Sequence, residues 1–440
     1  MDADVTDSAG RTPAEPADTD NDTGNGVSDD NDAETPASGP DRKRHWLRWT
    51  ALGTSVVVLA VAGAGWWFYK KLDGNITTDT GAAAELRTYE KERPTPIVLD
   101  AKNILLIGSD SRSGKGNDKY GRDDTGSQRS DTTILLHLAE DGQSATGVSI
   151  PRDLMVDIPS CRKPDGTRST AQFAQFNWAF QFGGTACTVR TVEKLTGIRV
   201  DHHMVVDFNG FKGIVDAVDG VEVCLKEPVD DIQAQLRLPA GTQTLDGEQA
   251  LGFVRARHGI GDGSDTQRME RQQRFLGALF KKVRSNGVLL NPTRLYPVLD
   301  AATKSITTDP GLNSLTDLYD LARSMQSVPV EKVQFLTVPR QPYRADRNRD
   351  ELVQPAAGNL FERLREDGPV AVETPGGTDR KGAGAGPTAE PGTTAGSAPT
   401  AGSTPTAGPN PATGPTATAG STPGPGPTFE GTNAAAGLCE

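Results

Sequence analysis

The sequence is poor in aromatic residues and in cysteine. Aromatic side chains make up 5% of the 440 residues, and there are 4 cysteines. So few cysteines exclude a small scaffold held together by disulfides, and the composition also excludes collagen and a coiled coil. Basic residues are not in excess, because 46 Lys and Arg stand against 58 Asp and Glu. The composition therefore does not favour a nucleic-acid-binding protein.

Several common catalytic motifs are missing as well. The sequence has no G-x-S-x-G nucleophile elbow, and its histidines lack the spacing of zinc ligands with cysteine. Residues 108–116 read GSDSRSGKG, which is one residue too long for a Walker loop and lacks its Ser or Thr. We therefore exclude nucleotide binding through a P-loop.

The two ends of the chain are predicted to be disordered. Residues 1–41 hold twelve acidic residues and one basic residue, which gives a net charge of −11 out of −12 for the whole chain. They contain almost no large apolar side chains, so we expect a disordered, cytoplasmic leader. Residues 369–440 are rich in Pro, Gly, Thr and Ala, which predicts a disordered extracellular tail.

One long apolar run follows the leader. Residues 49–69 carry no charge, and a helix of this length spans roughly the ~30 Å hydrocarbon layer of a membrane. Basic residues cluster just before the run, and aromatic residues lie at both of its ends. We predict a membrane anchor over residues 42–71, with a cytoplasmic amino terminus. A cleaved signal peptide and a buried helix are the alternatives.

Strand-like and helix-like patterns alternate after a polar connector at residues 72–97. We therefore predict one α/β domain over residues 98–368. The expected strands are 103–107, 132–137, 145–150, 204–206, 221–225 and 333–338. The expected helices are 172–182, 189–195, 208–218, 246–255, 266–284 and 315–325.

Two aspartates adjoin predicted strands. Asp110 follows the first strand, and Asp131 immediately precedes the second. If these strands are neighbours, the two carboxylates converge at one edge of the sheet, where α/β proteins bind ligands. Carboxylate pairs without a nearby His or Cys suit a hard cation such as Mg²⁺ together with phosphate oxygens. The alternative is that Asp110 caps a turn and Asp131 caps a strand.

Arginine gives the stronger signal. Residues 250–284 contain eight basic and three acidic residues. Arg255 and Arg257 are two apart and share a face only if the helix has ended there, while Arg268 opens the next helix. Arg152 follows another predicted strand. Guanidinium groups bind phosphate through paired hydrogen bonds, so these arginines predict a diphosphate clamp. The alternative is a solvated basic helix face.

The four cysteines would tend to form disulfides outside the membrane. Cys161 and Cys187 flank a short predicted helix, so a local bridge between them is the first choice. Cys224 and Cys439 are the remaining pair. Four cysteines allow three connectivities, and the sequence leaves all three open.

Many short motifs in one order resemble the LytR-CpsA-Psr family over about residues 98–350. The motifs are NILLIGSDSR (103–112), RSDT (129–132), VSIPRD (148–153), DFNGF (207–211), DGV (219–221), LDGEQAL (245–251), RAR (255–257) and DTQRMERQQ (265–273). The resemblance implies a single domain with a central mixed β-sheet flanked by helices. It also implies a membrane enzyme that moves a wall glycopolymer from an undecaprenyl (polyprenyl) pyrophosphate carrier to peptidoglycan and forms a phosphodiester.

The resemblance assigns a role to each motif residue. Asp110 and Asp131 would hold Mg²⁺ (or Mn²⁺). The pyrophosphate would be gripped by Arg129, Arg152, Arg255, Arg257 and Arg268. Asp265 would orient an arginine, and Gln272 would lie at the pocket wall. The apolar tunnel for the polyprenyl chain would be lined by Phe211, Ile214, Val215, Phe253 and Phe275. No residue is an obvious general base, and Asp153 is a candidate.

Other functions stay open at this point. The same site could hydrolyse the pyrophosphate of polyprenyl lipids, or the domain could retain polyprenyl phosphates without catalysis. The family name has also been attached to transcriptional regulators. The predicted cytoplasmic segment is acidic and would repel DNA, so we expect membrane lipid, glycopolymer and peptidoglycan as partners and no nucleic acid.

Overall fold

The computed structural model describes residues 42–109, 130–261, 263–285, 292–373 and 427–436. The chain divides into two compact units, Met1–Gly63 and Ala64–Glu440. Helix α1 (Arg42–Asp73) crosses the boundary between them. Its segment Arg48–Asp73 is long and apolar enough to cross a membrane, and its most apolar stretch is not buried in protein. The predicted acidic leader, residues 1–41, lies outside the described residues.

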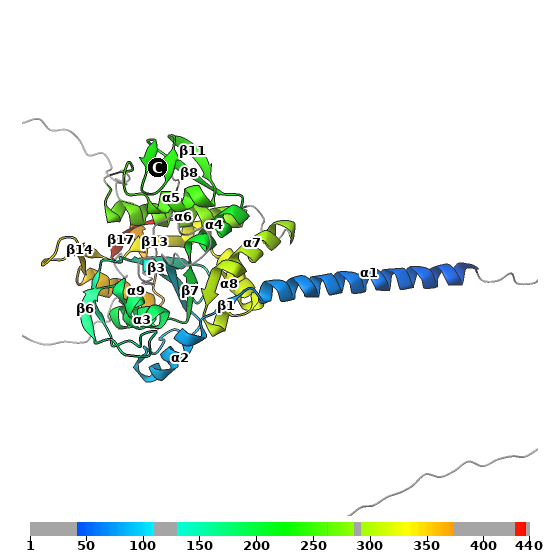
Figure 1. The fold of residues 1–440 in the computed structure, drawn as a ribbon, viewed down its shortest axis with the longest axis horizontal. Coiled ribbons are helices and arrows are strands. Elements are labelled where there is room, and N and C mark those ends of the chain that lie inside the picture. Colours follow the sequence, from blue (N-terminus) through cyan, green and yellow to red (C-terminus); the bar gives the residue numbers. More distant parts are fainter. Residues whose placement is uncertain (1–41, 110–129, 262, 286–291, 374–426, 437–440) are drawn as a thin grey trace, which may run out of the picture. The chain divides into compact units, whose positions relative to one another are not determined.

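The second unit is built around a nine-stranded mixed sheet with the order β1-β12-β7-β2-β3-β4-β13-β17-β16 (Figure 1). Strands β2, β4, β7 and β13 run parallel to one another, and β3 lies antiparallel between β2 and β4. The strand that ends just before Asp110 (β2) and the strand that contains Asp131 (β3) are thus confirmed as neighbours. The strands are β1 (Thr77–Thr78), β2 (Lys102–Ser109), β3 (Ser130–Leu138), β4 (Ala145–Ile150), β7 (His202–Val206), β12 (Ile306–Thr308), β13 (Val333–Thr337), β16 (Ala371–Glu373) and β17 (Thr428–Asn433).

Helices cover both faces of this sheet. Successive residues of the central strands are apolar, so both faces carry apolar side chains that the helices bury. In β2, Ile104 and Leu105 point to opposite faces and are 1% and 0% exposed. Leu105 packs with residues of α2, α3 and α9, whereas Ile104 packs on the other side with α6 and α8 (Figure 1). The helices are α2 (Thr80–Thr88), α3 (Trp178–Thr196), α6 (Asp265–Ser285), α8 (Leu315–Ser327) and α9 (Ala356–Arg365). The predicted α/β class is confirmed.

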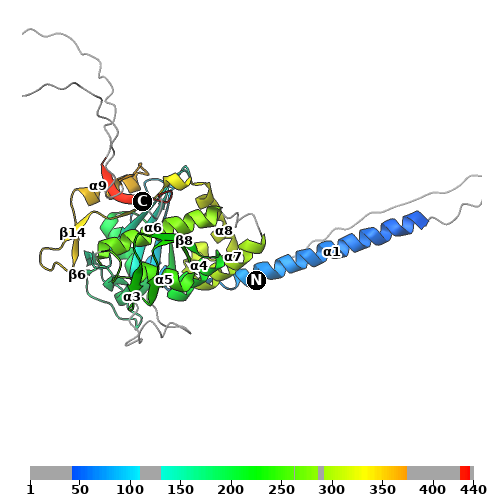
Figure 2. The ribbon, with the colours of Figure 1, turned by 90° about the horizontal axis from the view of Figure 1, so that it is seen from above.

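Helices α4 and α5 lie beside α6 and form a further layer with two hairpins (Figure 2). Both helices begin with an aspartate cap. Asp207 accepts a hydrogen bond from the backbone of Gly210, and Asp246 forms a capping box with Gln249. The elements are α4 (Phe208–Ala217), α5 (Gly247–Arg255), α7 (Pro292–Ser305), β8 (Val221–Leu225), β9 (Val229–Asp231), β10 (Leu236–Leu238) and β11 (Gly241–Leu245).

The helix predicted at 172–182 is wrong in its first part. Gln172–Gln175 form β6, which pairs antiparallel with β5 (Met155–Ile158). The pairing gives the backbone its hydrogen bonds and leaves Phe173 exposed while Ala174 is buried. A second small hairpin joins β14 (Arg340–Pro342) and β15 (Asp350–Leu352).

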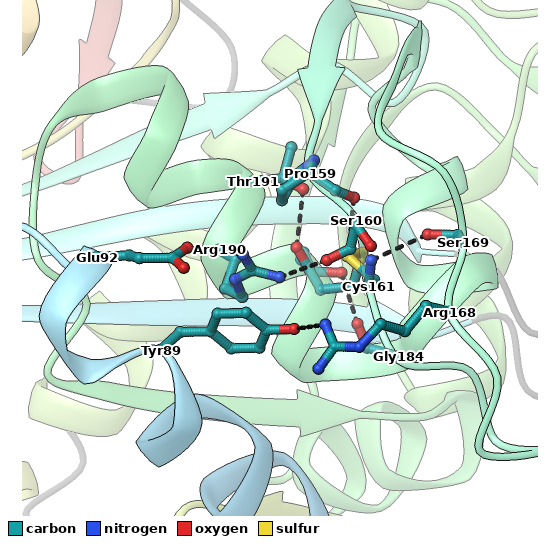
Figure 3. Close-up of a disulfide and its surroundings, with 12 residues drawn as sticks. Tyr89, Glu92, Pro159, Ser160, Cys161, Arg168, Ser169, Gly184, Arg190 and Thr191 are labelled. Atoms are coloured by element: carbon teal, nitrogen blue, oxygen red, sulfur yellow. Dashed lines mark hydrogen bonds and ion pairs between the residues drawn. A yellow bond between two sulfur atoms is a disulfide. The ribbon is translucent and has the colours of Figure 1, made fainter.

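The predicted disulfide between Cys161 and Cys187 is confirmed, with 5.5 Å between the Cα atoms. It ties the loop after β5 to the middle of α3. Figure 3 shows Arg190 and Tyr89 beside it, and the Arg190 guanidinium lies 3.3 Å from the centre of the Tyr89 ring. The connector that carries Tyr89 is therefore packed onto the domain. Cys224 is disulfide-bonded as well, and its predicted partner, Cys439, lies outside the described residues.

The predicted disordered tail, residues 369–440, is wrong at both of its ends. β16 and β17 belong to the central sheet, where β17 pairs antiparallel with β13 and parallel with β16 (Figure 1). Phe429 and Ala434 are 5% and 3% exposed. The composition of the whole tail concealed a short segment that pairs with β13, a strand whose other edge is already occupied by β4. Residues 374–426 lie outside the described residues.

Candidate active site at the edge of the central sheet

Four residues at strand ends meet at one edge of the central sheet. Ser109 ends β2, Asp131 lies at the start of β3, Arg152 follows β4 and Asp207 follows β7. Because β2, β4 and β7 are parallel and β3 runs in the opposite direction, these positions share an edge. All four residues line one cavity with a volume of about 450 Å³.

Helices α4, α5 and α6 form the opposite wall of this cavity. Arg255 is the last residue of α5, and the backbone turns away from the helix at Ala256, where ψ is 137°. Arg257 therefore lines the same cavity as Arg255, as we expected if the helix ended there. Arg268 and Gln272 lie one turn apart on α6 and also line it. We use the name arginine clamp for Arg152, Arg255, Arg257 and Arg268.

One carboxylate holds two arginines of the clamp. Asp265 accepts a hydrogen bond from Arg257 Nη2 at 2.8 Å and another from Arg268 Nη2 at 3.1 Å. The Arg268 side chain is 8% exposed, and its Nε has no hydrogen-bond partner among the described residues. Burial lowers the pKa of Arg268 to about 10, and repulsion from Arg257 and Arg152 contributes. Arg268 is thus a buried cation with a donor still to be satisfied, which favours binding of an anion.

Arg152 extends the clamp to the strand side of the cavity. Its Nη1 lies 3.3 Å from Asp131 Oδ1, and its Nε donates to Asp153 Oδ2 at 3.1 Å. Burial acts to lower the pKa of Arg152, but the charges of Asp153 and Asp131 outweigh it and raise that pKa. Asp153 also accepts hydrogen bonds from Gln175 and Arg349. Asp153 is therefore a support for Arg152, and this geometry argues against its use as a general base.

Two residues that position the clamp, Phe208 and Asp231, were not predicted from the sequence. The guanidinium carbon of Arg255 lies 4.7 Å from the centre of the Phe208 ring. Asp231 accepts the backbone N–H groups of Arg257 and His258, each at 2.8 Å. Burial acts to raise the pKa of Asp231, but four backbone N–H donors outweigh it and lower that pKa. Only the folded backbone brings these donors together, so the sequence carried no signal for this role.

The other end of the cavity is apolar. Of the predicted tunnel residues, Phe211, Ile214 and Phe275 line it. Phe253 and Val215 are buried and do not line it, and the Phe253 ring lies 6.3 Å from that of Phe275. The remaining apolar lining residues are Leu106, Ile134, Val206, Phe208, Leu251, Val254, Leu276 and Leu279.

Two predicted site residues, Asp110 and Arg129, lie outside the described residues. The described part of the predicted metal pair is Asp131, whose side chain is 38% exposed at the cavity. Ser109, which precedes Asp110, lines the same cavity. Within the described ranges, no group of three or more His, Cys, Asp or Glu could hold a metal ion. A carboxylate at an edge with a neighbouring hydroxyl suits a hard cation that also takes phosphate oxygens.

Known proteins resemble this chain in sequence and fold. It is 33% identical to the cell wall biosynthesis protein LcpA of Corynebacterium glutamicum, over 65% of this chain and 58% of that protein. It is 33% identical to the polyisoprenyl-teichoic acid–peptidoglycan teichoic acid transferase TagU of Enterococcus faecalis, over 58% of this chain and 75% of that protein. The crystal structure of protein gbs0355 from Streptococcus agalactiae has a similar fold, with a TM-score of 0.50 and 22% identity over 61% of this chain and 88% of that chain.

The sequence matches extend over only part of the curated relatives, since the chain spans about half the length of the two proteins from Corynebacterium glutamicum. The match to a family model is broader. Residues 72–366 fit the LytR_cpsA_psr family, and this range contains the arginine clamp, Asp131 and Asp265. The protein therefore belongs to the LytR-CpsA-Psr family.

Proposed function

We propose that the protein is a membrane-anchored phosphotransferase that moves a glycopolymer from a polyprenyl pyrophosphate carrier to peptidoglycan. The observation that carries this proposal is one cavity with the arginine clamp at one end and an apolar lining at the other. A polyprenyl pyrophosphate has the same two parts, a diphosphate and a hydrocarbon chain. The activity named for the Enterococcus relative supports peptidoglycan as the acceptor.

The clamp would bind the diphosphate. Repulsion among Arg268, Arg257 and Arg152 contributes to the lowered pKa of Arg268, and a bound diphosphate would relieve it. The anion would also supply a partner for Arg268 Nε. Donors fixed beforehand by carboxylates need little reorganisation when charge develops in the transition state, so loss of one typically reduces the rate by about 10²–10³-fold.

In the proposed step, a sugar hydroxyl of peptidoglycan attacks the phosphorus atom that carries the glycopolymer. A new O–P bond forms and the bond between that phosphorus and the bridging oxygen breaks, so polyprenyl monophosphate leaves. The hydroxyl proton passes to an oxygen of the leaving phosphate. The clamp stabilises the negative charge that collects on this leaving group, and strong basic catalysis is not required.

We also propose that Asp131, together with Asp110, would hold Mg²⁺ or Mn²⁺. The ion would neutralise charge on the phosphate oxygens. Asp131 lies beside Arg152, so the metal site and the clamp would adjoin.

The proposal includes an orientation in the membrane. Arg42, Lys43, Arg44 and Arg48 precede or begin the apolar segment of α1, against Lys70 and Lys71 at its other end. The positive-inside rule then places the amino terminus in the cytoplasm and the domain outside. Protease added to intact, wall-stripped cells should remove the domain, and protection of the domain would contradict this orientation.

The full-length protein in detergent tests the reaction. It is incubated with a polyprenyl-pyrophosphoryl saccharide, Mg²⁺ and peptidoglycan, and saccharide bound to peptidoglycan is measured. Transfer should be lost when Arg255→Ala is combined with Arg257→Ala. It should persist with Lys281→Ala, an exposed residue of α6 outside the cavity. Absence of transfer by the wild type would refute the proposal, and lipid binding without turnover would instead indicate a binding module.

A further inference from the structure

A second cavity, of about 540 Å³, lies on the face of α6 that points away from the first cavity. Thr266, Glu270 and Arg274 of α6 line it, whereas Arg268 and Gln272 line the first. At 100° per residue these two sets fall on opposite sides of the helix. The other walls come from the β14–β15 hairpin, from the end of β13 and from β17.

The lining of this second cavity combines apolar residues with polar side chains and with charged side chains of both signs. Arg340 is held in place by Asp350 at 2.6 Å and donates to Thr266 Oγ1. The side chain of Arg274 makes no hydrogen bond or ion pair with the residues that the structure describes. The acidic side chain of Glu430, an exposed residue of β17, lies in the same wall. The charged and polar side chains of this lining offer both donors and acceptors, which suits a hydroxyl-rich saccharide better than a bare polyanion.

The cavity lies close to the arginine clamp. Thr266 directly follows Asp265, the residue that holds Arg257 and Arg268. Gln273, a buried residue of α6 that also lines the second cavity, donates to Ser149 Oγ at 3.0 Å and to Thr337 Oγ1 at 2.9 Å. A ligand in the second cavity would thus lie about one helix diameter, roughly 10–12 Å, from the clamp. That separation is about the length of two sugar units.

We infer that this second cavity binds the saccharide chain of the acceptor, and we name it the acceptor cavity. The inference rests on the proposed function, because it assigns a place to the peptidoglycan strand in that reaction. Thr428, Phe429, Glu430, Gly431 and Thr432 of β17 line the cavity. Strand β17 therefore has a second role beyond pairing with β13 and β16: it builds one wall of the acceptor cavity.

Binding tests the inference without turnover. The probe is a soluble, uncrosslinked peptidoglycan oligomer, titrated into the full-length protein in detergent without donor. Arg274→Glu should weaken binding at least about tenfold, because it replaces a charge-assisted donor by a carboxylate. Gln341→Trp, which places an indole in the cavity from an exposed position of β14, should weaken it similarly. Lys281→Glu, which also reverses a charge but at an exposed position of α6 outside the cavity, should leave the affinity unaltered. Equal affinity in all four proteins would overturn the inference.

Transfer kinetics separate the acceptor from other sources of saccharide. Arg274→Glu should raise the KM for the oligomer about tenfold while kcat and the Kd for the polyprenyl-pyrophosphoryl saccharide stay within twofold of wild type. A weakened donor Kd with an unchanged acceptor KM would show that the donor polymer occupies the cavity, which overturns the assignment. If wild type binds the oligomer, Arg274→Glu weakens that binding and no transfer occurs, the proposed function fails and the cavity remains a saccharide-binding site without an acceptor role. Thermal melting establishes that each variant is folded.

Discussion

Replacing Asp265 with Asn tests whether one carboxylate organises the clamp. The change keeps the shape of the side chain but removes the charge that faces Arg257 at 2.8 Å and Arg268 at 3.1 Å. Arg268 is nearly buried, and loss of a buried partner typically costs about 3–5 kcal/mol. Asp265 is 24% exposed, and the amide can still accept a hydrogen bond, which reduces this figure. The Arg257 side chain is 36% exposed, so its ion pair with Asp265 contributes less than about 1 kcal/mol.

We therefore expect Asp265→Asn to reduce the free energy of unfolding by about 2–3 kcal/mol. For a domain of this size that corresponds to a fall in Tm of roughly 5–10 °C. Transfer should fall by about 100-fold, because two donors lose their fixed orientation. Differential scanning fluorimetry and initial rates measure the two effects, and Asp320→Asn, an exposed aspartate of α8, is the control. The reasoning would be refuted by a variant whose Tm lies within about 2 °C of the wild-type value and whose transfer rate lies within about threefold of the wild-type rate.

Three further predictions concern the metal, Asp231 and the disulfide. Asp131→Ala should reduce transfer by roughly 100-fold and raise the Mg²⁺ concentration needed for half-maximal rate; an unchanged Mg²⁺ titration would contradict the proposed site. The lowered pKa of Asp231 stabilises the fold above about pH 4, and this stability is lost as the pH falls through its folded pKa. Asp231→Asn should therefore flatten the acid limb of a Tm–pH profile, and an identical acid limb would exclude this role. Cys161→Ser with Cys187→Ser should lower unfolding stability by about 3.5 kcal/mol in urea titration, since a loop spanning 26 positions is no longer closed; a loss below about 1 kcal/mol would show that the bond is dispensable.

The sequence predicted the parts of the site that depend on chain order. Asp131 and Arg152 are next to strands whose apolar pattern is strong, and the pairing of those strands then brings the side chains to one edge. The turn after Arg255 was expected from the spacing of the two arginines and is seen at Ala256. These predictions needed only local patterns and one assumption, that the strands are neighbours.

The sequence could not predict features that depend on contacts between distant segments. Asp231 acts through four backbone N–H groups, and a backbone donor has no side-chain signature. Phe253 and Phe275 are both phenylalanines within helices, yet of the two only Phe275 lines the cavity. β17 was hidden because its pairing partner, β13, lies about 95 residues earlier, beyond the range of any local pattern.

The two proposed binding sites together restrict where the chemistry would occur. If the diphosphate lies on one face of α6 and the acceptor saccharide on the other, their reacting atoms can meet only around an end of that helix. The amino-terminal end is the one where both linings converge, since Asp265 holds the clamp and Thr266 lines the acceptor cavity. The helix dipole at this end also stabilises a phosphate whose charge is increasing. An acceptor hydroxyl that reaches the first turn of α6 would thus meet phosphorus, the positive end of the helix dipole and the arginine clamp at one place. The amino terminus of α6 is therefore where we expect the new phosphodiester to form.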